Sequence, residues 1–188
     1  FNISKDDITV VLFLHHTENK YKDQLNKPAL NWDNQLYILN EIFALFSEIK
    51  NLKIIFRFKN IEWIKNNKFQ EIISKIERTN NMFIDKDYET SFFSYSLARF
   101  ANVVVGPHSS ILDELIEAGF ENVLILDYGY RIKSIVRNLK YENTKFICKN
   151  SNDLQNRLKI ILNDKKSLNF KNNSLQQQIS YKDKLYEI

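Results

Sequence analysis

Six short runs of apolar, mostly β-branched residues recur along this chain of 188 residues. They cover residues 8–15, 52–58, 82–85, 102–106, 122–127 and 145–148. Apolar runs of this length are typical of strands that are buried on both faces. The segments between and after them have apolar residues at the three- and four-residue spacing of helices. These segments lie at about 35–50, 61–78, 90–100, 109–118, 131–139 and 151–163.

This alternation predicts βαβ units, because parallel strands need a crossover connection that a helix usually supplies. We therefore predict an α/β fold with a Rossmann-like parallel sheet of about six strands and helices on both faces. The length suits one domain, and 44% hydrophobic with 27% charged residues is typical of a globular protein. We expect the domain to cover residues 1–165 and a polar, helix-compatible tail to cover 166–188.

Ligands of such sheets bind beyond the carboxyl ends of the strands, so residues that directly follow strands are candidates for a site. These residues are His15–His16, Arg57–Lys59, Asp85–Asp87, Gly106–Ser110 and Asp127–Tyr130. Arg57 has the planar fork that can bind a phosphate through two hydrogen bonds. His15 and His16 are candidates for contacting a sugar or donating a proton. A structural role is the alternative for each of them.

Two of the three glycines and one of the two prolines fall within residues 103–120, VVVGPHSSILDELIEAGF. Gly106 ends a predicted strand, and the proline after it restricts the backbone where the chain must turn. Ser109 or Ser110 then caps a helix, and the spacing from Ser110 to Asp113 resembles a capping box. We predict that the free amides of this helix N-terminus bind an anion. His108, within the turn, is a further candidate for ligand contact.

A helical wheel divides the predicted helix into an apolar face and a polar face. The apolar face consists of Ile111, Leu112, Leu115, Ile116 and Gly119. Asp113 and Glu117 point to solvent, whereas Glu114 lies on the flank, one turn beyond Ser110. A carboxylate at this distance from a phosphate site is suited to accept hydrogen bonds from a ribose. The alternative is a plain cap followed by a charged helix face.

Other classes of function receive little support. Cys148 is the one cysteine, which excludes an internal disulfide, and the three histidines lack the spacing of a metal site, so we expect no metal. The net charge of +4 is scattered and the aromatic residues do not alternate with a basic stripe, so we expect no nucleic-acid partner. No apolar run approaches the roughly 18–20 residues of a membrane span, and we expect a cytoplasmic protein.

The segment at about 100–130 resembles the C-terminal, donor-binding domain of GT-B glycosyltransferases. Their pattern is a strand ending in a small residue, a Ser/Thr turn, a Glu on a helix that Ala-Gly closes, and another strand. The corresponding residues are Gly106, His108–Ser109–Ser110, Glu114, Ala118–Gly119 and 122–127. The Glu lies five residues before the Gly, as in the N-acetylglucosaminyltransferases that form lipid II and in UDP-N-acetylglucosamine 2-epimerases. In element order the resemblance spans about residues 8–163.

The resemblance implies that Ser109 and Ser110 contact phosphate, that Glu114 binds the ribose and that Arg57 neutralises a diphosphate. The chain would then be one half of a GT-B fold that binds a UDP-, GDP- or CMP-linked sugar without a metal or other cofactor. Its partner would be a glycan or lipid-linked acceptor of bacterial surface polysaccharide synthesis, at the inner face of the membrane. A preceding domain would supply the acceptor site and the base. A 2-epimerase-like domain and a non-catalytic nucleotide-binding or scaffold domain remain alternatives.

Overall fold

The computed structural model describes residues 3, 7–14, 32–49, 51–58, 61–86, 91–127 and 144–163. Its strands are β1 (Ile8–Leu14), β2 (Leu52–Phe58), β3 (Met82–Ile84), β4 (Val103–Gly106), β5 (Val123–Leu126) and β6 (Ile147–Cys148). Its helices are α1 (Trp32–Phe46), α2 (Glu62–Lys65), the 3₁₀ turn η1 (Asn67–Phe69), α3 (Gln70–Glu77), α4 (Ser91–Phe100), α5 (Ser110–Glu117) and α7 (Ser151–Asn163). None of the described helices is long and apolar enough to cross a membrane.

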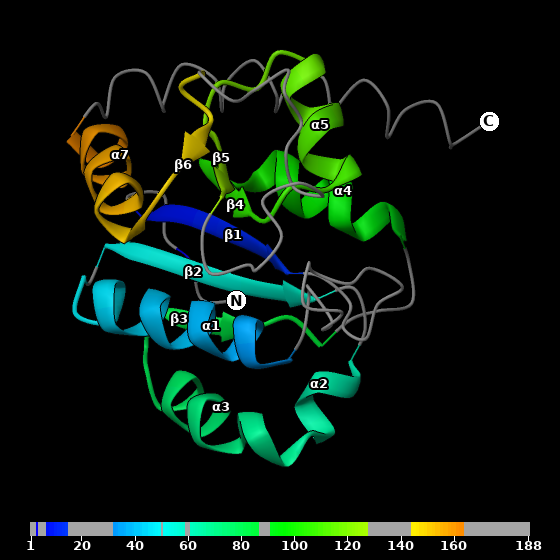
Figure 1. Cartoon of the computed structure of the whole chain (residues 1–188), viewed down its shortest axis with the longest axis vertical. Helices are drawn as coiled ribbons and strands as arrows, with labels where there is room; N and C mark the ends of the chain where they lie inside the picture. Colours follow the sequence, from blue (N-terminus) through cyan, green and yellow to red (C-terminus); the bar gives the residue numbers. More distant parts are fainter. Residues whose placement is uncertain are drawn as a thin grey trace, which may run out of the picture.

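The strands form one sheet in the order β3-β2-β1-β4-β5-β6, and every neighbouring pair is parallel. This is the strand order of a Rossmann-type sheet: the chain runs outward from β1 to β3, then returns to the other side of β1. The predicted α/β fold with a six-stranded parallel sheet is therefore confirmed (Figure 1).

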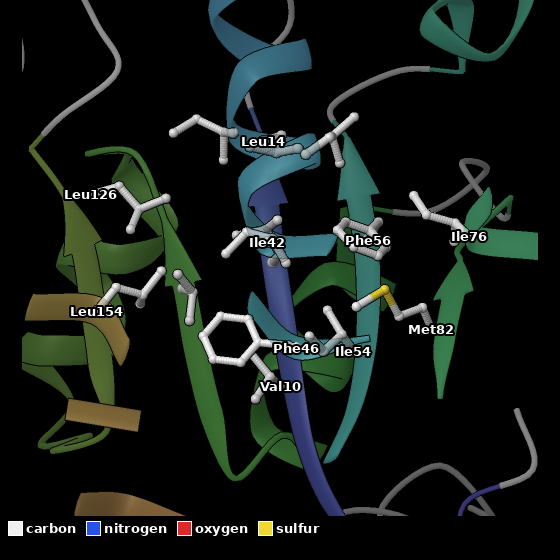
Figure 2. Packing of buried hydrophobic residues seen from close by; sticks show 14 of the residues in the cluster. Val10, Leu14, Ile42, Phe46, Ile54, Phe56, Ile76, Met82, Leu126 and Leu154 are labelled. Carbon is white, nitrogen blue, oxygen red and sulfur yellow. The ribbon is translucent and has the colours of Figure 1, made fainter. Parts of the chain in front are cut away.

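Helices cover both faces of the sheet, as the sequence predicts. Side chains of α1, α3 and α7 pack with one face, whereas side chains of α4 and α5 pack with the other. Figure 2 shows the first face, with Ile42 and Phe46 of α1 lying over Val10 of β1 and Ile54 of β2. The second cluster includes Val11 and Phe13 of β1. Neighbouring residues of β1 thus point into different layers, which explains why its seven residues are all buried.

One helix boundary differs from the prediction in a way that has a local cause. The segment 61–78 is not one helix, because Asn66 has an extended backbone with φ −79° and ψ 124°. The side chain of Asn66 accepts a hydrogen bond from the backbone N–H of Lys68 at 3.0 Å, and the chain restarts as η1 and α3. Asparagine competes for backbone hydrogen bonds in this way, and apolar spacing does not reveal it. The predicted helix at 131–139 and the tail at 166–188 lie outside the described residues.

Candidate functional site

The strand order reverses between β1 and β4. The connections that follow these two strands lie on opposite faces of the sheet, so a crevice can form between them. A pocket of about 400 Å³ lies at the carboxyl ends of these strands. Its lining residues are Phe13, Leu14, Arg57, Phe58, Ser94, Tyr95, Pro107, Ser109, Ser110 and Ile111. Most of this wall is apolar, and its polar residues are Arg57, Tyr95 and three serines. This combination is typical of small-molecule sites.

Gly106 allows β4 to come close to β1 at the edge of this pocket. A Cβ atom built on Gly106 would lie 2.5 Å from the carbonyl oxygen of Phe13, which no side chain can tolerate. The prediction that Gly106 ends a strand is confirmed. Its structural role is to permit this close approach, and it is not one of the described residues that line the pocket.

Of the two serines predicted as caps of the helix after this turn, one occupies the N-cap position. Ser110 is already the first residue of α5, and Ser109 is the N-cap, with an extended backbone whose carbonyl accepts hydrogen bonds from the amides of Leu112 and Asp113. The Ser109 hydroxyl makes no cap hydrogen bond. The predicted capping box of Ser110 and Asp113 is wrong, because the Asp113 carboxylate lies 3.0 Å from His108 Nε2 instead of capping the helix.

The Ser109 hydroxyl is buried and has no hydrogen-bond partner within the described part of the chain. A buried hydroxyl without a partner costs free energy, so it needs an explanation. Ser109 and Ser110 both line the pocket, next to the N-terminus of α5. The first amides of a helix have no intrahelical acceptor and carry the positive end of the helix dipole. An acceptor-rich anion in the pocket would provide partners for these groups.

Arg57 is held in place before any ligand arrives. Its side chain is 5% exposed and forms a buried ion pair with Asp85, which is 3% exposed. Arg57 Nε also donates a hydrogen bond of 2.8 Å to Ser94 Oγ. Arg57 therefore lines the pocket, while its guanidinium is bonded to the residue after β3 and to α4. The sequence predicts the position of Arg57, whereas it gives no signal that Ser94 contacts it.

Glu114 lies where the helical wheel predicts, on the flank of α5, but its carboxylate has a partner within the protein. Tyr95 Oη donates a hydrogen bond of 2.6 Å to Glu114 Oε2. This bond to the carboxylate, together with partial burial and the negative charge, raises the pKa of Tyr95 above its ordinary value. Tyr95 lines the pocket, whereas Glu114 is exposed and is not among the described lining residues. The sequence contains one signal for Tyr95, its place on the helix that leads to β4, and this signal does not mark it as a site residue.

Two further candidates are described by the structure, and neither lines this pocket. His108 is half-buried, faces Asp113 and is not one of the described residues in the pocket wall. Asp127 is also not one of the described residues in the pocket wall, and its backbone N–H donates to the carbonyl of Cys148 at 2.9 Å. His15, His16 and Lys59 lie outside the described residues, as do 87–90 and 128–130. Over the ranges that the structure describes, no group of three or more His, Cys, Asp and Glu side chains could hold a metal ion.

Comparisons with known proteins add no family assignment. No model of a known protein family matches the chain, and no curated protein is significantly similar to it.

Proposed function

We propose that this pocket binds a nucleotide-sugar and that the chain is the donor-binding half of a GT-B glycosyltransferase. The transferred sugar would go to a glycan or lipid-linked acceptor in bacterial surface polysaccharide synthesis. The observation that carries the proposal is the buried hydroxyl of Ser109, which has no hydrogen-bond partner among the described residues and lies at the N-terminus of α5, in the same pocket as Arg57. A phosphate group can accept hydrogen bonds from this hydroxyl and from the first amides of the helix.

In the proposed reaction, negative charge develops on the nucleotide phosphate as the glycosyl bond breaks. The amides at the start of α5, the hydroxyls of Ser109 and Ser110 and the guanidinium of Arg57 would stabilise that charge. Because Asp85 and Ser94 already orient Arg57, its donors need little reorganisation during the reaction. Asp85 also offsets the charge of Arg57, so we assign Arg57 an orienting role as a hydrogen-bond donor. The base that activates the acceptor is not assigned to a residue of this chain.

Calorimetric titration of the chain with UDP, GDP and CMP tests the proposal. We expect Ser109→Ala to weaken binding of the preferred nucleotide by about 1–3 kcal/mol, because a hydrogen bond to a charged group is lost. The same substitution should leave the free energy of unfolding in the absence of ligand unchanged or raise it, since the buried hydroxyl has no hydrogen-bond partner within the described part of the chain. This combination separates a ligand contact from a structural cap.

Ser151→Ala is the control, because it also removes a serine hydroxyl at the start of a helix, α7, that does not line the pocket among the described residues. It should leave nucleotide affinity unchanged. A chain that binds none of the three nucleotides would contradict the proposal, as would an equal effect of the two serine substitutions on affinity.

A further inference from the structure

We propose that the ring of Tyr95 contacts the nucleoside part of the ligand and that Glu114 acts through Tyr95, as a positioning residue, instead of binding the ribose directly. This inference rests on the proposed function, because it concerns recognition of a nucleotide in the same pocket. It assigns a binding role to a residue that the sequence motif does not include.

Polar and apolar residues are unevenly distributed around the pocket. Ser109, Ser110 and Arg57 form the polar part of its wall, where we propose that the phosphate binds. Phe13, Leu14 and Phe58 contribute apolar wall, and Tyr95 adds an aromatic ring that is 39% exposed. A nucleotide has the same division into an anionic group and a flat ring system. Aromatic side chains bind such ring systems by stacking, whatever the identity of the base.

A hydrogen bond between two helices fixes the position of this ring. The hydrogen bond of 2.6 Å from Tyr95 Oη to Glu114 Oε2 joins α4 to α5, and its ionised acceptor makes it stronger than a neutral one. An exposed tyrosine would otherwise lose rotamer freedom when it binds a ligand. Glu114 removes part of that cost in advance. The carboxylate thus has a function that does not require contact with a ribose.

Helix α4 connects both parts of the pocket through two consecutive residues, Ser94 and Tyr95. Ser94 accepts the hydrogen bond from Arg57 Nε, and Tyr95 donates to Glu114. The anion-binding guanidinium and the aromatic ring are therefore held by the same turn of one helix. We infer that this turn sets the distance between the phosphate and the base.

The chain contains a matched pair of residues outside the pocket. Tyr37 Oη donates a hydrogen bond of 3.2 Å to Glu41 Oε1 on α1, and Tyr37 is 53% exposed. Tyr37 does not belong to the described residues that line the pocket. Tyr37→Ala therefore controls for the general loss of an exposed tyrosine that is bonded to a glutamate.

The test is a double-mutant cycle on the full chain, read by calorimetry with UDP, GDP and CMP, and with pyrophosphate as the anion without a base. We expect Tyr95→Ala to weaken the preferred nucleotide about tenfold or more and to leave pyrophosphate binding unchanged. Glu114→Ala should weaken the nucleotide by about threefold, as a lost pre-organising contact does. Tyr95→Phe, which keeps the ring and loses the hydrogen bond to Glu114, should weaken nucleotide binding by the same factor as Glu114→Ala. The double variant Tyr95→Ala/Glu114→Ala should match Tyr95→Ala alone, and Tyr37→Ala should match the wild type.

The cycle separates the possible failures. If Glu114→Ala weakens binding by the same factor with and without Tyr95, Glu114 contacts the ligand directly and the positioning role is overturned. If Tyr95→Ala binds nucleotide as the wild type does, the ring contact is overturned, while the proposed function stands on wild-type binding and the effect of Ser109→Ala. If the wild type binds no nucleotide, both proposals fall. Thermal unfolding of each exposed-site variant verifies that it is folded.

Discussion

Cys148 illustrates how burial alone changes the chemistry of one residue. Its side chain is fully buried in β6, as the sequence predicts for a small apolar strand residue. Burial raises the pKa of the Cys148 thiol from 9.0 to about 12, an effect that the nearby positive charge of Arg157 only partly opposes. The native thiol therefore stays protonated at neutral pH, where only the thiolate reacts as a nucleophile.

We expect iodoacetamide to label Cys148 at pH 8 in urea but not in the native protein.

The raised pKa of the Cys148 thiol should make the free energy of unfolding decrease as the pH rises from about 9 to 12. In that interval the unfolded thiol loses its proton while the buried thiol keeps it, so the native state binds more protons. Urea denaturation of the wild type and of Cys148→Ala across this pH range measures the difference in slope. Equal slopes in the two proteins would contradict the assignment to Cys148.

Single residues also mark the limit of what the sequence predicts about the site. The segment 106–119 is correctly placed at a strand-to-helix turn, because glycine, proline and serine have strong local preferences. The sequence does not predict the hydrogen-bond partners of its side chains. Asp113 approaches His108 and Glu114 is bonded to Tyr95, which lies nineteen positions earlier in the chain. The contact between Glu114 and Tyr95 depends on how α4 and α5 pack, and the spacing of apolar residues contains no information on that packing.

At the level of whole elements, α5 shows how a helix ends by backbone geometry. Gly119 has a φ of +85°, which side chains other than glycine and asparagine rarely adopt. The amide of Gly119 donates to the carbonyl of Ile116 at 3.0 Å, and that of Phe120 donates to the carbonyl of Leu115 at 2.9 Å. These two bonds form a Schellman motif, which provides donors for the last free carbonyls of the helix.

We expect Gly119→Ala to lower the free energy of unfolding by about 1 kcal/mol, because alanine must adopt the left-handed conformation at this position. Open space surrounds the site, so a steric clash contributes nothing to that loss. Gly119→Asn is the matched variant, since asparagine tolerates positive φ better, and it should lose less. Urea denaturation compares the two. A larger loss for asparagine than for alanine would show that backbone conformation is not the cause.

The elements themselves are well predicted where hydrophobic spacing determines them. The run 52–58 is β2 as predicted, and the segment 151–163 is α7. Predictions fail where a local polar contact decides, as at Asn66, which divides the segment 61–78. The buried strands have continuous apolar runs because α1 covers one face of the sheet and α4 and α5 cover the other. The fold class therefore follows from pattern, whereas helix boundaries follow from individual hydrogen bonds.

At the scale of the whole molecule, the buried Arg57–Asp85 pair connects parts that are distant in the sequence. Arg57 is in β2, Asp85 follows β3, and Ser94 of α4 accepts a hydrogen bond from the same guanidinium. The three elements meet at the carboxyl end of the sheet, where the pocket lies. A hydrophobic pair of similar size often stabilises a fold at least as well as a buried ion pair. Stability alone therefore does not explain the pair, whereas the proposed binding of a phosphate gives Arg57 and Asp85 a role.

Separate removal of the two charges and their joint replacement test this view. Asp85→Ala leaves the buried guanidinium without its counter-ion, and we expect it to lower the free energy of unfolding by about 3–5 kcal/mol. Arg57→Met/Asp85→Leu removes both charges and should recover most of that loss, while nucleotide binding stays weak because the phosphate donor is gone. Glu77→Ala, which breaks an exposed pair with Lys86, should leave the urea midpoint close to that of the wild type. If the double variant binds nucleotide as tightly as the wild type, Arg57 is not a ligand contact; if it remains as unstable as Asp85→Ala, the pair is essential to the fold.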